Sequence, residues 1–205
     1  MGAPATAPRA TSRRALQRHE TRERIYEAAV DEIARSGLGA ADVGAIVAAA
    51  GVARGTFYFH FPTKEHVLAD LEVREETSIV TGLERLALPA DDPSAVFAAV
   101  VRRVRAAERR LGPSLFRDML SIHFSPVVSD DGGVGEHPLA IFLVAAMQKA
   151  QRAGRVATTV DAGDVAVIFL TGLFAILATR GGPGRARDAL LDTYVATILR
   201  GVTTS

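Results

Sequence analysis

Residues 43–51 constrain the fold more than any other part of the chain, because they combine a helical apolar stripe with a glycine stop. Val43, Ile46, Val47 and Ala50 recur at the i, i+3, i+4, i+7 spacing of one helix face. Gly51 follows directly and is able to adopt the positive φ that ends a helix. A second short segment, 54–61, begins only three residues later. Two short helices joined by so tight a turn predict a helix-turn-helix, whose second helix fits the DNA major groove.

Helical periodicity dominates the rest of the chain as well, with no strand-like alternation of useful length. Residues of the helix-capping type, Asp42, Thr63, Asp92 and Asp161, precede four of the expected helices. We therefore predict an all-α fold of about nine helices, in an N-terminal three-helix helix-turn-helix domain and a larger C-terminal helical domain. The expected organisation is a flexible basic arm over 1–18, the helix-turn-helix domain over 19–63 and the larger domain over 64–205. The helices after the arm are expected at about 19–35, 43–50, 54–61, 64–86, 93–111, 113–124, 138–153, 162–179 and 185–200.

Basic charge collects at the end of the chain that holds the predicted helix-turn-helix. Residues 1–64 carry nine Lys/Arg against six Asp/Glu, a net charge of +3, whereas residues 65–205 carry fifteen against seventeen, a net charge of −2. The overall net charge of +1 hides this asymmetry. A basic N-terminal part is what neutralisation of DNA phosphates requires.

The composition argues against an enzyme. The chain has no cysteine, which excludes disulfides, thiolate catalysis and cysteine-ligated zinc. The glycine-rich run 132–135 follows Asp130 and Asp131, whose charges would repel a phosphate, and no strands are predicted for a dinucleotide fold. We expect neither a cofactor nor a metal site, because His123, His137 and the two aspartates are too scattered to converge on an ion.

The chain is expected to be cytoplasmic, with no membrane partner. Residues 1–18 contain no apolar run of the kind that a secretory signal needs. The most apolar stretch, 165–178, includes Thr171 and Gly172 and is shorter than the roughly 20 residues that span a bilayer. A buried helix is the better interpretation of that stretch.

The second short helix carries the candidate DNA contacts. Phe57 and Phe61 lie four residues apart and are expected to anchor it to the other two helices. Arg54 is suited to guanine O6 and N7, and the hydroxyls of Thr56 and Tyr58 to phosphate oxygens. Gly55 would let the backbone approach the DNA closely. Phe59 has two open interpretations, contact with a thymine methyl group or plain core packing.

Two further groups of cations have open interpretations. Lys64 stands in the first turn of the next expected helix, where a cation opposes the helix dipole unless a phosphate binds there. It would otherwise simply be solvated. The arginines of the expected arm, Arg9, Arg13, Arg14 and Arg18, would either enter a minor groove or only make the tail soluble.

From about Thr21 to Leu68 the chain resembles the DNA-binding domain of the tetracycline-repressor (TetR/AcrR) family. The resemblance is carried by Thr21-Arg22-Glu23-Arg24-Ile25, Ala28-Ala29, Gly37-Leu38, Val43, Ile46, Ala49-Ala50-Gly51-Val52, the run Gly55-Thr56-Phe57-Tyr58-Phe59-His60-Phe61, Lys64-Glu65 and Leu68. By position, the residues that match the family's DNA-contacting stretch are Arg54, Gly55, Thr56, Tyr58, Phe59, His60 and Lys64. Two positions depart from the family pattern: Ala53 stands where serine often caps the recognition helix, and Asp42 where threonine or serine is frequent.

The resemblance implies a homodimeric, ligand-responsive transcription factor, usually a repressor. In such proteins the fourth helix connects the DNA-binding head to a larger domain with an inducer pocket, and the last two helices form the dimer interface. Here the last two helices would be 162–179, which is apolar nearly all round, and 185–200. The residues expected at the dimer interface are Phe169, Leu173, Ile176, Leu191, Tyr194, Val195 and Ile198. The alternative is that both helices are buried within a monomer.

The larger domain also offers candidates for a ligand pocket. Large apolar side chains on several of its helices would suit an apolar ligand, and His123 is the one polar candidate for orienting it. The expected pocket residues are Phe97, Val101, Phe116, Leu120, His123, Phe124, Met147 and Phe169. Residue by residue, ordinary core packing is an equally open interpretation of these aromatic and aliphatic side chains.

The function expected from these features is a DNA-binding transcriptional regulator. Its simplest form is a homodimeric repressor that a small, largely apolar effector releases from a palindromic operator. The expected partners are a double-stranded DNA operator, a second copy of the chain and an unidentified small-molecule effector. Two alternatives stay open: an activator of the same fold, and a helical protein-interaction module, which would not need the phosphate-binding pattern of Tyr58 and Lys64.

Overall fold

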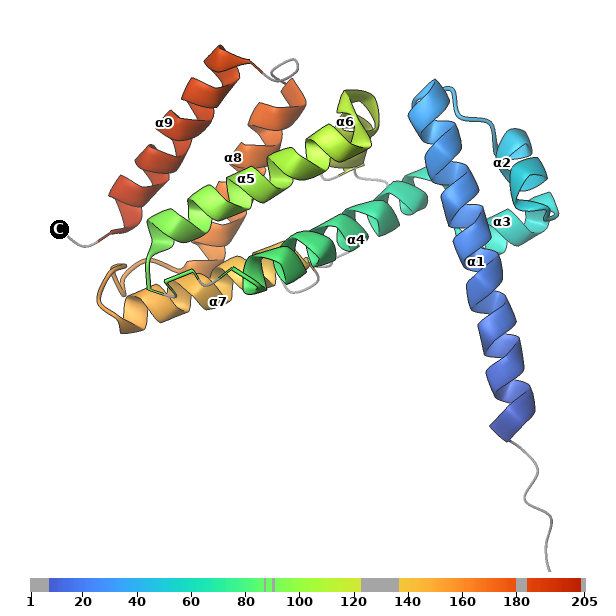
Figure 1. Ribbon diagram of the computed structural model, residues 1–205, viewed down its shortest axis with the longest axis horizontal. Helices are drawn as coiled ribbons and strands as arrows, with labels where there is room; N and C mark the ends of the chain where they lie inside the picture. Colours follow the sequence, from blue (N-terminus) through green and yellow to red (C-terminus); the bar gives the residue numbers. More distant parts are fainter. Residues whose placement is uncertain (1–7, 87, 90, 123–136, 180–183, 204–205) are drawn as a thin grey trace, which may run out of the picture. The chain divides into compact units, whose positions relative to one another are not determined.

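The computed structural model describes residues 8–86, 88–89, 91–122, 137–179 and 184–203, and this part of the chain is almost entirely helical (Figure 1). Nine helices and no named strand occur in these ranges, so the prediction of an all-α fold is confirmed. The helices are α1 (Pro8–Ser36), α2 (Val43–Ala50), α3 (Arg54–His60), α4 (Lys64–Glu84), α5 (Pro93–Leu111), α6 (Pro113–Ile122), α7 (Pro138–Arg152), α8 (Ala162–Thr179) and α9 (Arg185–Val202).

The chain divides into two compact units, Met1–Leu68 and Ala69–Ser205. The first unit holds α1, α2, α3 and the first turn of α4, and the second holds the rest of α4 and α5–α9. The sequence placed the boundary at the start of α4, whereas contacts place it one turn inside this helix. The first turn of α4 belongs with α1–α3 because Val67 and Leu68 are fully buried.

The core of the first unit follows the predicted apolar stripes. Ile25, Ala29 and Ile33 of α1 are fully buried, as is Ile46 of α2. The Asp42 side chain caps α2 by accepting a hydrogen bond from the Gly44 N–H at 2.9 Å. Gly51 ends the same helix at φ 65°, in the left-handed region that side chains disfavour. Capping and termination therefore confine α2 to two turns and set the start of the turn that leads to α3.

The structure corrects the start of the first helix. Residues 1–18 were predicted to be a flexible arm, but α1 begins at Pro8 and runs without a break to Ser36. Proline is favoured in the first turn of a helix, and no glycine or further proline interrupts residues 9–36. The apolar stripe that marked the helix begins only at Ile25, because residues 13–20 are exposed and do not need apolar side chains.

An aromatic stack joins three helices in the core of the second unit. The rings of Phe97 on α5 and Phe169 on α8 lie parallel, with centroids 4.3 Å apart and an interplanar angle of 11°. Tyr194 on α9 also stacks on Phe169, with centroids 6.0 Å apart and an interplanar angle of 15°. Its hydroxyl donates to the carbonyl oxygens of Ile168 and Phe169 at 2.6 and 3.0 Å. The stack fixes how α9 lies on α8.

A buried ion pair also ties α9 to α5. The Arg187 guanidinium donates to both carboxylate oxygens of Glu108, at 2.7 and 2.8 Å, and both residues are 4% exposed. The neighbouring pair of Arg105 and Asp188 lies at 2.7 Å. A bidentate contact of this kind fixes the orientation of the two side chains as well as the distance between them.

Helix α8 is apolar enough for a membrane span by length and composition, and it is the one such helix in the described ranges. In the structure it packs into the core of the second unit against α6, α7 and α9, and its Phe169 stacks on Phe97 of α5. The interpretation of this stretch as a buried helix agrees with that packing.

We expect the Arg187→Met substitution to destabilise the protein by about 3–5 kcal/mol, because it leaves the Glu108 carboxylate buried without its partner. The double substitution Glu108→Leu/Arg187→Met should recover most of this loss, since no buried charge then remains. Urea denaturation followed by circular dichroism measures both. A loss below about 1 kcal/mol for the single substitution would show that the pair is not buried in solution.

Candidate DNA-binding surface and effector cavity

Helix α3 presents two different faces. Phe57 and Phe61 are 0% and 1% exposed and anchor it to the core of the first unit, as predicted. Tyr58 and Phe59 are 45% and 65% exposed, so core packing no longer accounts for Phe59. The other residues predicted to contact DNA on this helix are Arg54 and Gly55, which are exposed, and Thr56 and His60, which are half-buried.

Two arginines of α1 lie on aromatic rings at α3, in contacts that no local sequence pattern marks. The Arg18 guanidinium carbon lies 4.9 Å from the centre of the Phe59 ring, and that of Arg22 lies 4.6 Å from the centre of the Phe61 ring. Both distances are within the range of cation–π attraction. Partial burial lowers the pKa of His60, and the charges of Arg18 and Arg22 lower it further. The exposed side of α3 is therefore electropositive through its arginines and not through its histidine.

Lys64 has a role that neither sequence interpretation anticipated. Its ammonium donates to the carbonyl oxygens of Leu38 and Ala41, each at 2.8 Å. The same loop is held from α1 by Glu32, whose carboxylate accepts from the Asp42 N–H at 3.2 Å. This backbone hydrogen bond, together with that from Arg35, lowers the pKa of Glu32. An ammonium has three N–H donors, so Lys64 keeps one for a further acceptor.

A small apolar cavity lies inside the second unit. It has a volume of about 20 Å³ and lies between α4, α5, α6, the start of α7 and the second half of α8. The side chains that line it are Glu72, Glu75, Glu76, Ile79, Val104, Ala107, Phe116, Met119, Leu120, Leu139 and Phe174. A volume of this size is roughly the room that one water molecule needs. A ligand would therefore have to push its walls apart.

The structure brings only part of the predicted pocket to this cavity. Phe116 and Leu120 line it, whereas Phe97 and Phe169 are stacked on each other in the core. Met147 is buried away from the cavity and Val101 is half-buried outside it. Phe97, Met147 and Phe169 therefore pack as core in the described part of the chain. The predictions for His123 and Phe124 lie outside the described residues.

Three glutamates of α4 at the cavity were not predicted. Glu72 and Glu76 are 4% and 3% exposed, and Glu76 accepts a hydrogen bond from the Leu139 N–H at 3.2 Å. Burial raises the pKa of Glu75, although its ion pair with Arg110 acts in the opposite direction. Their 3–4 residue spacing along one helix face was visible in the sequence, but only the fold shows that this face points inward.

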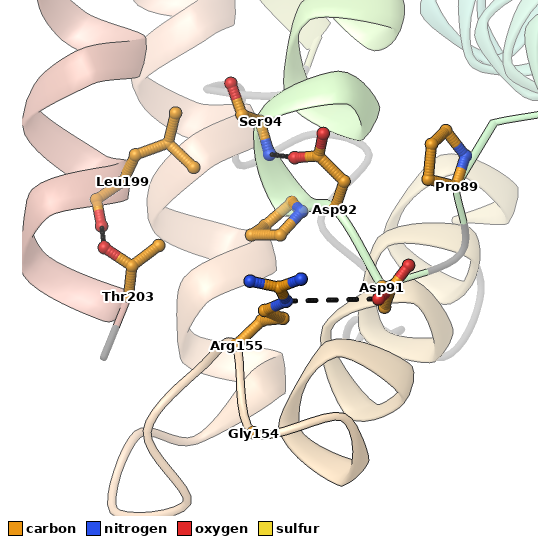
Figure 2. Close-up of a pocket in the computed structure, with 9 residues that line it drawn as sticks. Pro89, Asp91, Asp92, Ser94, Gly154, Arg155, Leu199 and Thr203 are labelled. Atoms are coloured by element: carbon orange, nitrogen blue, oxygen red, sulfur yellow. Dashed lines mark hydrogen bonds and ion pairs between the residues drawn. The ribbon is translucent and has the colours of Figure 1, made fainter. Parts of the chain in front are cut away.

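A second, more open hollow of about 690 Å³ lies where α9 ends, beside the start of α5 (Figure 2). Asp91 and Arg155 face each other across it, with an Nε to Oδ2 distance of 4.0 Å. The Asp92 carboxylate is occupied in capping α5, where it accepts from the N–H groups of Ser94 and Ala95. The carboxylates and the guanidinium that line this hollow thus bind each other or the backbone. None of the predicted pocket residues lines the hollow.

The predicted dimer interface splits into buried and accessible positions. Phe169, Leu173 and Leu191 are at most 2% exposed within one chain, so the structure corrects their assignment to an interface. Their burial in the monomer core is what made the two helices so apolar. Ile176, Tyr194, Val195 and Ile198 keep part of their surface, and Val167 and Ile168 on α8 are 43% and 56% exposed. In the described ranges no cluster of three or more His, Asp or Glu side chains is placed to hold a metal ion.

Comparison with protein families supports the interpretation of the first unit. Residues 25–71 match the family described as bacterial regulatory proteins, tetR family. This range contains α2, α3, the buried part of α1 and the start of α4. No curated protein matches the chain.

Solved structures share the fold over nearly the whole chain. FadR of Thermus thermophilus, a TetR-family transcriptional repressor in complex with lauroyl-CoA, is 22% identical, with a TM-score of 0.75 over 88% of this chain and 94% of that one. A putative tetR-family regulator from Shewanella sp. PV-4 is 18% identical, with a TM-score of 0.63 over 90% and 99%. SmeT, the repressor of the Stenotrophomonas maltophilia multidrug efflux pump SmeDEF, is 19% identical, with a TM-score of 0.59 over 91% and 93%. At these identities the similarity shows the fold.

Burial raises the pKa of Tyr194 to about 12, so its phenol stays protonated in the fold at a pH where the unfolded chain loses the proton. The stability that this group contributes is fully present below pH 10 and is lost as the pH rises towards 12. We expect a tyrosine absorbance component with a midpoint near pH 12 that disappears in Tyr194→Phe. If the variant retains that component, the late titration belongs to another tyrosine.

Proposed function

We propose that this chain, whose residues 25–71 match the tetR family of bacterial regulatory proteins, is a ligand-responsive transcriptional regulator that represses from DNA as a homodimer. One observation carries the proposal: α3 is anchored by two buried phenylalanines and exposes Arg54, Tyr58 and Phe59 on its outer side. A short helix held firmly with polar and aromatic groups outward is suited to the major groove.

The exposed residues divide by the chemistry of their contacts. Arg54 would read a base edge, most simply guanine O6 and N7, and Phe59 would pack against a thymine methyl group. Thr56, Tyr58, His60 and the remaining N–H of Lys64 would bind phosphate oxygens and set the register. Gly55 allows close backbone approach, since a Cβ there would meet open space and not another protein atom. Such a protein would work in the cytoplasm, where the DNA is.

We expect Arg54→Ala to weaken operator binding by about 1–3 kcal/mol and to relax the base preference at one position in each half-site. Tyr58→Phe should weaken binding to all sequences alike. The measurement is fluorescence anisotropy with the DNA that flanks the gene, in a salt series, because loss of phosphate contacts flattens the salt dependence.

Arg102→Ala is the matched control, since it removes the same charge from an exposed position on α5 in the other unit. If Arg54→Ala binds as tightly as the parent, α3 does not read the bases. If the parent itself shows no sequence preference on any flanking DNA, repression from a nearby operator is the wrong function.

A homodimer would form through the outer faces of α8 and α9. Val167, Thr171 and Ala175 follow one another at four-residue spacing on α8, beside the exposed Ile168. Val195 and Ile198 continue the apolar surface on α9. A two-fold axis through such a self-complementary patch would hold two recognition helices roughly 34–36 Å apart on a palindromic operator.

We expect Ile168→Asp to dissociate the dimer, because it buries a charge at the centre of this patch. Sedimentation equilibrium should then give the mass of one chain for the variant and twice that mass for the parent. Ile141→Asp on α7 is the control, since Ile141 is 50% exposed and lies outside α8 and α9. Equal dissociation by both variants, or a monomeric parent, would contradict the interface.

The effector would bind in the second unit. The cavity beside Phe116 and Leu120 has room for about one water molecule, so a small, largely apolar molecule would widen it and shift α4, which lines one wall. FadR of Thermus thermophilus was determined with lauroyl-CoA, so another protein of this fold holds a ligand with a long apolar chain. To shift the DNA-binding population from 99:1 to 1:99, the effector must prefer the released state by ~5.5 kcal/mol.

A further inference from the structure

The face of α1 that packs into the core of the first unit continues towards the N-terminus as a line of arginines. Ile25, Ala29 and Ile33 follow one another at four-residue spacing and are fully buried. Three residues before Ile25 stands Arg22, and Arg18 and Arg14 precede it, again at four-residue spacing. At 3.6 residues per turn, all six positions share one side of the helix. We call Arg14, Arg18 and Arg22 the arginine stripe.

The arginine stripe begins on α3 and extends past it. Arg18 lies over the ring of Phe59, in the last turn of α3, and Arg22 lies over the ring of Phe61, which directly follows α3. Arg14 stands one turn further along α1, about 6 Å beyond Arg18 at 1.5 Å per residue. Figure 1 shows this end of α1 running on beyond α2 and α3. The stripe therefore leads directly from the exposed side of α3 to a surface that the rest of the unit does not cover.

Ring contacts within the fold account for Arg18 and Arg22, but not for Arg14. The first turn of α1 has no acidic residue, although an acid there would stabilise the helix dipole and a cation opposes it. From Arg13 to His19 the helix carries three arginines and no acid, and all of these residues are exposed. Arg14 makes no hydrogen bond, ion pair or ring contact with any described residue. An exposed helix end that carries arginines and no acid, beside a surface suited to DNA, is the electrostatic footprint of a nucleic-acid contact.

We propose that the arginine stripe binds the phosphate backbone of the duplex next to the major groove that α3 enters. The proposal rests on the proposed function, because α3 must bind DNA for the stripe to reach it. Arg18 holds Phe59 and directs its charge outward, and Arg14 extends the contact by one helical turn. Since phosphates carry no sequence information, the stripe adds affinity and lengthens the bound site without changing the base preference.

Arg13 provides a closely matched control for Arg14. It is adjacent to Arg14, has the same charge and is also exposed, but it lies about 140° from Arg18 around the helix, against about 40° for Arg14. Arg13→Ala and Arg14→Ala therefore change the net charge and the helix propensity identically. Only the second removes a member of the stripe.

The experiment measures the salt dependence of operator affinity for the full-length parent and these two variants. We expect Arg14→Ala to reduce the slope of log K against log salt by about 0.9, the value for one lost phosphate contact, with the base preference unchanged. Arg13→Ala should keep the parental slope. On duplexes trimmed to the bases that α3 reads, the difference between the two variants should vanish, because the flanking phosphates are gone.

Three results would overturn the proposal, and they differ from a failure of the proposed function. Equal slopes for Arg13→Ala and Arg14→Ala would show that only net charge matters. A changed preference for A·T pairs in Arg14→Ala would show that the arginine reads a minor groove. A difference that persists on trimmed duplexes would place the contact elsewhere. If the parent binds no operator, or if Arg54→Ala has no effect, the proposed function itself fails first.

Discussion

A helix of seven residues cannot hold its own shape, and the function proposed for this chain depends on one. Isolated helices shorter than about 12–15 residues are marginal in water, so the geometry of α3 must come from its neighbours. Gly51 supplies the left-handed residue of the turn, and Phe57 and Phe61 are buried in the core of the first unit. Arg18 and Arg22 then stack on the rings at its far end. The surface offered to a partner is thus rigid although the helix is short.

In the second unit, the position of the last helix, α9, also depends on contacts with its neighbours. Only Arg187, Leu191 and Val202 of α9 are fully buried, so apolar packing alone fixes its position weakly. The Glu108–Arg187 pair and the stacked ring of Tyr194 replace that packing with directional contacts. Directional contacts need little area, which leaves the outer sides of α8 and α9 uncovered. Gly172 is part of the same arrangement, because a Cβ there would meet the Tyr194 hydroxyl at 2.3 Å.

The sequence predicts contacts between groups that are close along the chain, and it does not predict contacts between groups that are far apart. The caps at Asp42, Asp92 and Asp161 and the stop at Gly51 involve neighbours a few residues away, and the structure contains all of them. Lys64 finds its carbonyl partners 23 and 26 residues earlier, and Arg187 finds Glu108 at a separation of 79. No local pattern marks such pairs. The same limit explains why Phe97 and Phe169 were predicted for a pocket: periodicity shows that a ring faces inward, but not which ring it meets.

The electrostatics of the α3 surface follow from groups that do not titrate near neutral pH. Arginine keeps its charge under all ordinary conditions, whereas His60 already has a lowered pKa because it is partly buried beside Arg18 and Arg22. The field that attracts phosphates is therefore present at any physiological pH and needs no proton uptake. Stacking on a ring also holds part of that charge in position before DNA binds. A guanidinium held over a ring loses less conformational entropy on meeting a phosphate than a free side chain does. Exposing Phe59 costs apolar area in the free protein, and the cation that covers it offsets part of this cost while directing charge towards the DNA.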